Sequence, residues 1–138
     1  MMTLRSFAVA LAALVFYGFG AVGGMAASPS GRFCGEMISS GDYQDVETFF
    51  NVDRDGHVAG SYELDEPAGR VEGTLTEKDG AGTSRTLVWT DKYGTGLLDL
   101  KFSDDFKEFK GRWGGSTNGR FDAASHSWNG IRCTGIAD

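Results

Sequence analysis

The sequence predicts an all-β protein, a small antiparallel eight-stranded up-and-down β-barrel closed by one disulfide. Three observations support this prediction. Apolar and polar residues alternate with a period of two, no segment carries a helical stripe, and a pattern centred on glycine recurs. Around Gly60, Gly73, Gly111 and Gly130, apolar or aromatic residues stand two positions before the glycine and large side chains two positions after it. Such glycines let strands bend and let cross-strand aromatic rings lie over bare backbone, so the pattern predicts a tightly coiled sheet.

Residues 1–26 are predicted to be a signal peptide that precedes the fold. Arg5 is their only charge, 7–22 is an uncharged apolar stretch, and small residues follow at 23–27. The alternative is a retained membrane anchor, since the uncharged run continues to Ser28 and about 20 apolar residues can span a bilayer. Glycines interrupt the run and favour cleavage near Ala26. We therefore expect an exported protein, periplasmic or secreted, with no stable membrane insertion after signal removal.

Residues 27–138 have the length of a single domain with one core. The domain contains two cysteines, Cys34 near its start and Cys133 near its end, and in an exported chain such a pair predicts a disulfide. Closing so long a loop stabilises by about 4 to 5 kcal/mol through chain entropy. A redox-active pair is the alternative, but the Cys-x-x-Cys spacing is missing. In a closed barrel the first and last strands are neighbours, so the bond would fasten the seam.

The first four predicted strands cover 33–39, 43–52, 57–64 and 70–77. The second ends at the Asp-rich turn 53–56, and the third ends at the longer break 65–69, which contains Pro and Gly. The third and fourth strands each carry one glycine-centred pattern. The turn 78–82 then supplies two further glycines and ends the fourth strand.

The last four predicted strands cover 85–91, 96–103, 106–113 and 127–133. The turn 103–105 joins the sixth strand to the seventh as a hairpin. The seventh and eighth strands carry the other two glycine-centred patterns, and the Gly-rich connection 114–125 between them is the longest in the chain.

The period-two alternation separates inward from outward side chains. An eight-stranded barrel is just wide enough to be filled by its own side chains or to hold one small ligand. The bulky inward set favours filling, and a ligand that enters should be small and mostly uncharged. The residues expected inside are Val58, Gly60, Tyr62, Leu64, Val71, Gly73, Leu75, Leu87, Trp89, Leu98, Leu100, Phe102, Phe109, Gly111 and Trp113. Those expected outside are Glu63, Glu72, Thr74, Thr76, Asp99, Lys101, Glu108, Lys110 and Arg112.

Two segments resemble the avidin and streptavidin family. The run 55–63 (DGHVAGSYE) is similar to the third-strand segment of that family, and 106–113 (FKEFKGRW) is similar to its seventh-strand hairpin. The resemblance implies the eight-stranded barrel of the family and places Tyr62 where a ureido-binding tyrosine stands. Leu64 occupies the position of a ligand serine, and 37–40 offer no clear counterpart to the opening Asn and Ser ligands. The resemblance therefore implies the architecture more firmly than biotin binding.

The expected binding end of the barrel holds the connection 114–125 together with Tyr43 and 91–94. A long Gly-rich loop flanked by aromatic residues predicts a gated mouth, and a plain surface loop is the alternative. Trp89 and Trp113 can serve as aromatic pocket walls, as the family resemblance implies, or as core. The candidate ligand-binding residues are Tyr43, Tyr62, Trp89, Tyr93, Trp113 and Trp128.

Few residues form a recognisable catalytic or metal-binding pattern, so we predict no enzyme activity, no metal site and no cofactor. His57 and His126 fall at opposite barrel ends and cannot share a metal or a dyad within one subunit. Asp53 and Asp55 precede Gly56 too closely for a calcium loop and are typical of a hairpin turn. The turn aspartates Asp53, Asp55, Asp79, Asp104 and Asp105 share one end, as an acidic collar for a cationic partner or simply as solvated turns.

The formal net charge of −6 argues against nucleic acid, which requires a basic stripe. We expect a binding protein that holds a small apolar or aromatic ligand at the barrel mouth. The alternative is an envelope factor that docks onto a protein, of the inhibitor or immunity type, with a filled core. Phe49, Val88 and Leu97 are outward apolar positions that can mark a contact in a homo-oligomer.

Overall fold

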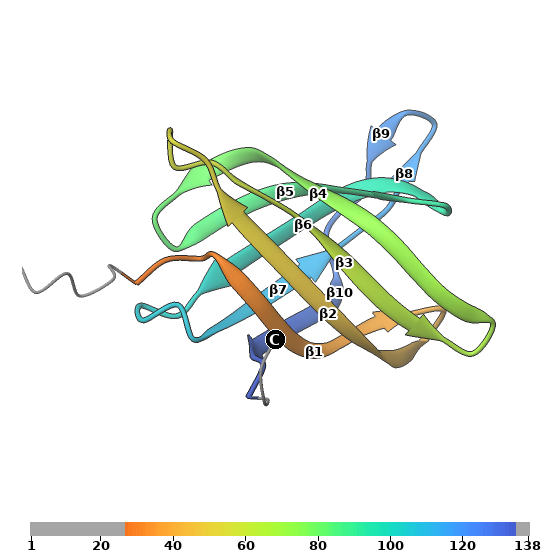
Figure 1. The fold of residues 1–138 in the computed structure, drawn as a ribbon. Coiled ribbons are helices and arrows are strands. Elements are labelled where there is room, and N and C mark those ends of the chain that lie inside the picture. The colour runs from red at the N-terminus through yellow and green to blue at the C-terminus, as the bar shows by residue number, and fades with distance from the viewer. Residues whose placement is uncertain (1–26, 135–138) are drawn as a thin grey trace, which may run out of the picture.

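A computed structural model describes residues 27–134, so the predicted signal peptide lies outside the described residues. Antiparallel strands form nearly all of the regular structure (Figure 1). Within this part of the chain, no helix has the length and apolar character needed to cross a membrane. The strands are β1 (Gly31–Ser39), β2 (Asp42–Val52), β3 (Val58–Glu66), β4 (Gly69–Ala81), β5 (Ser84–Asp91), β6 (Gly94–Phe102), β7 (Glu108–Trp113), β8 (Ser116–Thr117), β9 (Arg120–Phe121) and β10 (His126–Arg132).

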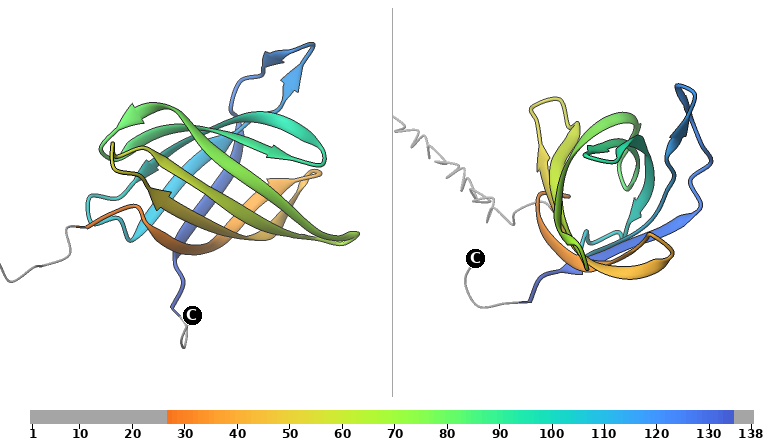
Figure 2. Two further views of the ribbon diagram at one scale, coloured as in Figure 1. Left: turned by 45° about the horizontal axis from the view of Figure 1, so that its top comes forward. Right: turned by 90° about the vertical axis from the view of Figure 1, so that its right-hand side faces the viewer.

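Eight of these strands close into a barrel in the order β1-β10-β7-β6-β5-β4-β3-β2, which confirms the predicted fold class. Successive connections alternate between two ends, because each strand runs antiparallel to the next. We call the end with the turns 53–57, 82–83 and 103–107 end A. The opposite end, with 40–41, 67–68, 92–93 and 114–125, is end B, and the right-hand view of Figure 2 looks into the barrel from that side.

The predicted disulfide joins Cys34 to Cys133, with 5.0 Å between the Cα atoms. It lies at the seam, where β1 pairs with β10 and Cys34 stands opposite Ile131. The bond therefore fastens the seam, as predicted, although Cys133 lies just after the last strand and not within it.

Glycines let aromatic rings lie against the sheet, which is the role that the repeated pattern predicted. Tyr62 stands directly opposite Gly73, and a Cβ atom built on that glycine would overlap the phenol ring. A Cβ on Gly130 would lie 2.6 Å from Cε1 of Phe109, its register partner on β7. These are two cases in which only glycine leaves room for the neighbouring ring.

Phenylalanine rings fill the barrel near end A. Phe33, Phe50, Phe102 and Phe109 are all almost fully buried, and neighbouring ring centroids lie 5.3 to 6.0 Å apart, mostly edge to face. Such edge-to-face contacts stabilise beyond the burial of area alone. This half of the barrel is a packed core, as the bulky inward set predicted.

Arg132 covers the packed half from the side of end A. Its guanidinium carbon lies 4.4 Å from the centroid of the Phe33 ring, and its Nε donates to the carbonyl oxygen of Phe106 at 3.0 Å. The same side chain donates to the carbonyl oxygens of Ser28 and Ser30. Arg132 thus fastens the start of the described chain and the 103–107 turn to one end of the barrel.

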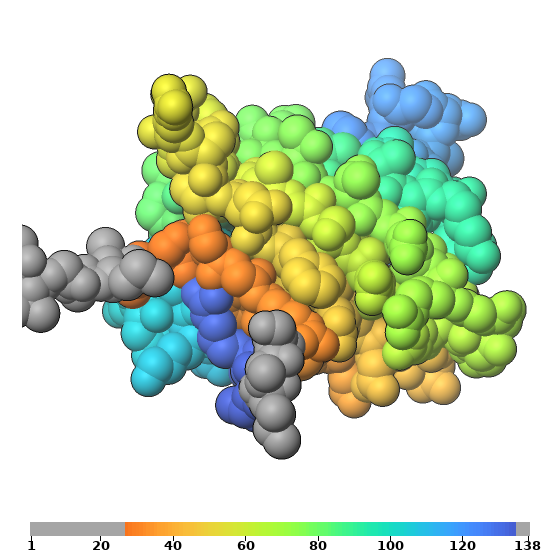
Figure 3. All heavy atoms as spheres, in the orientation of Figure 1, coloured from red at the N-terminus to blue at the C-terminus, as the bar shows by residue number. Residues whose placement is uncertain are grey.

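Of the predicted inward residues, all but Gly60 and Trp113 are buried, and the predicted outward residues point away from the core. Trp113 differs in degree, since it is only partly buried at the edge of the core. The connection 114–125 was predicted as a loop without strands, but it contains the β8–β9 hairpin. Asn118 and Gly119 have φ values of 52° and 76°, which suits the two-residue turn favoured in hairpins. The hairpin protrudes beyond the outline of the barrel at the upper right of Figures 1 and 3.

Candidate functional site

A cavity of about 230 Å³ opens at end B, in the half of the barrel that phenylalanine does not fill. Half of its lining residues are aromatic, and one is a carboxylate. The residues that line it are Met37, Ser39, Ser40, Tyr62, Leu64, Trp89, Asp91, Tyr93, Trp113 and Trp128. We call this space the mouth cavity.

Strand alternation brings most of these side chains together. Inward-facing positions repeat every second residue, so the last inward positions of each strand surround the mouth. Tyr62 and Leu64 lie near the end of β3, whereas Trp89 and Asp91 lie at the end of β5. Trp128 comes from the start of β10, the strand that runs back from this end. The mouth cavity is therefore built on strands, with only its rim on turns.

The aromatic walls meet at steep angles. The rings of Tyr62 and Trp128 have centroids 4.8 Å apart with 75° between their planes, and those of Trp89 and Trp113 are 5.6 Å apart at 89°. Tyr62 and Trp128 are almost fully buried. At these angles the edge of one ring packs against the face of its partner in each pair.

Each indole N–H around the mouth cavity donates a hydrogen bond within the protein. Trp89 donates to the carbonyl oxygen of Gly114 at 2.9 Å, and Trp113 donates to that of Ile38 at 2.9 Å. Trp128 donates to the hydroxyl of Thr48 at 3.1 Å. These bonds fix the orientation of the rings, since each one restrains an indole that is otherwise held by packing alone.

Two carboxylates organise the polar side of the mouth. Asp91 accepts a hydrogen bond from the Tyr62 hydroxyl at 2.6 Å and one from the backbone N–H of Tyr93 at 2.8 Å. Glu66, just behind the lining, accepts from the hydroxyls of Ser39 at 2.6 Å and Tyr93 at 2.8 Å. Burial, together with the bond to Asp91, raises the pKa of Tyr62, so its hydroxyl remains protonated and acts as a donor.

Five of the six predicted ligand-binding residues line the mouth cavity: Tyr62, Trp89, Tyr93, Trp113 and Trp128. The sixth, Tyr43, lies on the outer surface, where it is 58% exposed and stands opposite Ile38 on β1. The same alternation that turns Val46 inward turns Tyr43 outward, because the two residues are three positions apart on β2.

Sequence reasoning missed the polar members of the site. Asp91 follows Leu87 and Trp89 on the inward face of β5, and Glu66 follows Tyr62 and Leu64 in the same way on β3. Their position in the alternation could have predicted that both carboxylates face inward. The predicted loop gate, by contrast, contributes no lining side chain from 115–125, because the β8–β9 hairpin stands away from the barrel.

Around end A, the turn residues mainly satisfy their own backbone. Asp53 Oδ1 accepts from the N–H groups of Asp55 and His57, both at 2.9 Å, as in an ordinary Asp-rich turn. Asp105 accepts a backbone N–H bond in the same manner. Asp79 accepts one from Gly80, but it lies within β4, which continues through the predicted turn 78–82 to Ala81. These bonds favour the role of solvated turns over that of an acidic collar. Among residues 27–134, no group of three or more potential ligand side chains is placed to hold a metal ion.

Glu77 links His57 and Arg85 at the same end. Its side chain is only 4% exposed, and its two oxygens lie 2.7 Å from Nδ1 of His57 and from a guanidinium nitrogen of Arg85. Burial by itself would raise the pKa of Glu77, but the hydrogen bonds from Arg85 and His57 outweigh it and lower that pKa. The bond to Glu77, followed by the charge of Asp53, raises the pKa of His57. His126 lies at end B, so the two histidines are separated as predicted.

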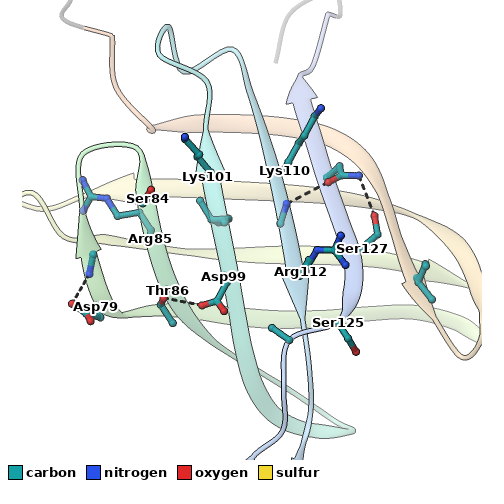
Figure 4. Close-up of a pocket in the computed structure, with 16 residues that line it drawn as sticks. Asp79, Ser84, Arg85, Thr86, Asp99, Lys101, Lys110, Arg112, Ser125 and Ser127 are labelled. Carbon is teal, nitrogen blue, oxygen red and sulfur yellow. Dashed lines mark hydrogen bonds between the residues drawn. The ribbon is translucent and has the colours of Figure 1, made fainter.

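The outer face of β5, β6, β7 and β10 carries a broad depression (Figure 4). Lys101 and Lys110 stand directly opposite each other on β6 and β7, and Asp99 stands opposite Arg112. Asp99 instead accepts a bond from the Thr86 hydroxyl at 2.8 Å, while Arg112 points toward Ser127. We call Lys101, Lys110 and Arg112 the basic trio; none of the three belongs to an ion pair of the described residues.

The three outward apolar positions do not form one patch by pairing. Val88 and Leu97 face each other across β5 and β6, and both are partly buried. Phe49 lies on β2, with the guanidinium carbon of Arg32 6.0 Å from its ring centroid. The role of these positions in a homo-oligomer therefore stays a prediction.

The fold and the site define a class of protein, a small disulfide-closed antiparallel β-barrel with an aromatic-lined cavity at one mouth and a packed core at the other. No protein-family model matches the chain, and a comparison with curated proteins gives no match either.

Proposed function

We propose that this protein is an exported, non-catalytic binding protein that holds a small ligand with an apolar or aromatic body in the mouth cavity. The observation that carries the proposal is the cavity itself. Its walls are aromatic rings whose N–H groups are already bonded within the protein, so the surface offered to a ligand is largely apolar. Concave, mostly apolar pockets with a few fixed polar groups are typical of small-molecule sites.

The avidin-like resemblance supports the architecture of this proposal but does not supply the ligand. Tyr62, which stands at the position of a ureido-binding tyrosine, donates its hydroxyl to Asp91 at 2.6 Å. Leu64, at the position of a ligand serine, presents an apolar side chain to the mouth cavity. A ureido oxygen would find neither of these two donors, and each missing buried hydrogen bond costs about 1 to 3 kcal/mol. We therefore propose a ligand other than biotin.

Native mass spectrometry of the protein purified from its exporting host tests the proposal. We expect an extra mass that is lost on denaturation. Leu64→Phe places a larger side chain into the mouth cavity and should remove that mass while the barrel remains folded. Val88→Phe, on the outer face of β5, adds similar bulk outside the cavity and should retain the mass. A bare protein mass in the wild type, or a mass unaffected by Leu64→Phe, would count against the mouth cavity.

A second candidate function is docking of an acidic segment of a protein partner onto the outer face. The basic trio favours it, because two lysines placed directly opposite each other are mutually destabilising and are relieved by an anionic partner. Poly-glutamate serves as the probe, with binding measured as a function of salt. The double change Lys101→Glu and Lys110→Glu should abolish binding, whereas Lys78→Glu, on β4, should not. Equal binding by both variants would argue against this face.

A further inference from the structure

We infer that the ligand of the mouth cavity carries a cationic group, specifically an alkylated ammonium on an apolar body. The inference rests on the proposed function, since it assigns the chemical class of the ligand at the same site. Three features of the mouth cavity lead to it: its aromatic rings, its small number of free hydrogen-bond donors, and the carboxylates of Asp91 in the lining and Glu66 just behind it.

The aromatic walls favour a cation over a neutral group of the same shape. The faces of aromatic rings carry negative electrostatic potential, and indole is the strongest of the common side chains in this respect. Three tryptophans and two tyrosines line the mouth cavity, with ring pairs set at 75° and 89°. An ammonium whose charge is spread over alkyl groups can contact the aromatic rings that line the cavity and loses little hydration on doing so.

Most hydrogen-bond donors around the cavity are already bonded within the protein. The three indole N–H groups go to Gly114, Ile38 and Thr48, and the hydroxyls of Tyr62, Tyr93 and Ser39 go to carboxylates. The rim hydroxyl of Ser40 is a further polar group, and it can donate or accept. An anionic ligand would therefore meet few hydrogen bonds to compensate for its lost water.

Acceptor capacity, by contrast, remains. Each carboxylate oxygen can accept about two hydrogen bonds, and the oxygens of Asp91 and Glu66 each accept one in the contacts described above. A ligand that brings positive charge or N–H groups can use the remaining lone pairs. The polar side of the mouth cavity thus offers hydrogen-bond acceptors to a ligand.

The charges around the rim point in the same direction. No lysine or arginine lines the mouth cavity. The ammonium of Lys92 lies 5.0 Å from the centroid of the Tyr93 ring, which lines the cavity. The chain thus places one of its own cations against an aromatic residue of the rim. His126 also contacts the lining, with its ring 4.9 Å from Trp113, but it is exposed.

A matched pair of probes tests the inference: choline and 3,3-dimethyl-1-butanol, in which a carbon replaces the charged nitrogen at nearly constant shape. Titration calorimetry, with tryptophan fluorescence as a second readout, measures both affinities on the intact protein. We expect choline to bind at least about 10-fold more tightly than the neutral alcohol, the size of effect that a desolvated cation–aromatic contact gives.

Three variants locate the effect. Asp91→Asn keeps an oxygen for the Tyr62 hydroxyl but removes the charge, and it should reduce the preference for choline several-fold. Asp104→Asn removes an equal charge from a turn at end A and should leave the preference unchanged. Lys92→Gln removes the competing cation at the rim and should strengthen choline binding. Thermal melts of each variant establish that it is folded.

The possible outcomes separate the two proposals. Equal binding of both probes, or tighter binding of the alcohol, overturns the cationic ligand and leaves the proposed function standing. A preference for choline that Asp91→Asn and Asp104→Asn reduce equally also overturns it, because the effect then comes from net charge rather than from the mouth cavity. Absence of binding by either probe overturns the cationic ligand, and the native mass measurement then decides the proposed function on its own.

Discussion

The phenol ring of Tyr62 lies across the backbone of Gly73, its direct partner on the neighbouring strand. The glycine leaves the space in which the ring reaches Asp91, and so one missing side chain on β4 sets the position of a wall of the mouth cavity. A single pair of residues thus links the barrel architecture to the candidate site.

Gly73→Ala should therefore destabilise the barrel and distort the site. The added methyl group overlaps the Tyr62 ring, and overpacking of this kind costs about 1 to 3 kcal/mol. Urea denaturation measures the loss, and near-ultraviolet circular dichroism follows the displaced ring. Gly115→Ala is the matched control, because its new Cβ would meet only the Asp122 carboxylate, at 3.8 Å. If the two variants lose equal stability, the contact between Tyr62 and Gly73 is not what requires glycine.

The ion pair between His57 and Glu77 should make stability depend on pH. Because the bond to Glu77 raises the pKa of His57 in the folded state, the protonated ring stabilises the fold. That contribution is fully present below pH 6.5, the ordinary histidine value, and is lost as pH rises through the higher folded pKa. Melting temperatures of the wild type and of His57→Gln, measured from the acidic to the alkaline side of this range, should differ at low pH and converge at high pH. A constant difference across the range would contradict this assignment.

Removing the disulfide should destabilise the fold without touching the binding site. The bond spans 99 residues of sequence, and loss of a native disulfide from a small secreted domain typically costs about 2 to 5 kcal/mol. The double variant Cys34→Ser and Cys133→Ser should show this loss in urea denaturation. Its ligand affinity in native buffer should match that of the wild type, because neither cysteine lines the mouth cavity. A large drop in affinity would show that the seam also shapes the site.

The hydroxyl of Thr48 should stabilise the folded barrel. It is 1% exposed and accepts the hydrogen bond of the Trp128 indole at 3.1 Å. Thr48→Val keeps the shape but leaves that N–H buried without a partner, which should cost about 1 to 3 kcal/mol. Thr48→Ser keeps the acceptor and is the matched control. Chemical denaturation of the two variants separates the hydroxyl from the methyl group, and equal losses would indicate that packing alone accounts for the burial of Thr48.

The β8–β9 hairpin should be dispensable for the barrel and for the mouth cavity. Replacing 116–121 with two glycines should change the free energy of unfolding by less than about 1 kcal/mol, because the hairpin protrudes from the barrel. Probe affinities should be unchanged, since none of these residues lines the mouth cavity. A loss of binding in the shortened protein would restore the gate that the Gly-rich connection predicted.

Most of the barrel could be predicted from local pattern. Alternation identifies the strands and their faces because an antiparallel barrel buries one side of every strand. The β8–β9 hairpin escaped this approach because its strands are two residues long and bury nothing, although Asn118-Gly119 was a usable turn signal. The prediction for Tyr43 was wrong because it rested on the aromatic side chain alone. The alternation along β2 places that side chain on the outer face.

The distribution of filled and empty space could not be predicted in this way. It depends on the height at which each inward residue lies along the barrel, and that height follows from the register between strands rather than from one strand alone. Phe33 from β1 and Phe102 from β6 meet at end A only because the closed order of strands brings them within 5.9 Å of each other. The carboxylates of Asp91 and Glu66 meet the same mouth for the same reason.

The phenylalanine cluster near end A closes the barrel at that end, so the mouth cavity opens only at end B. If the proposed ligand binds at end B, the packed rings leave it the same end for entry and release. Both the rate of capture and the rate of release then depend on the same few rim side chains, Tyr93 and Trp113 among them. A substitution at the rim should therefore change both rates together. The residence time of the ligand would then depend on the rim side chains as well as on the contacts inside the mouth cavity.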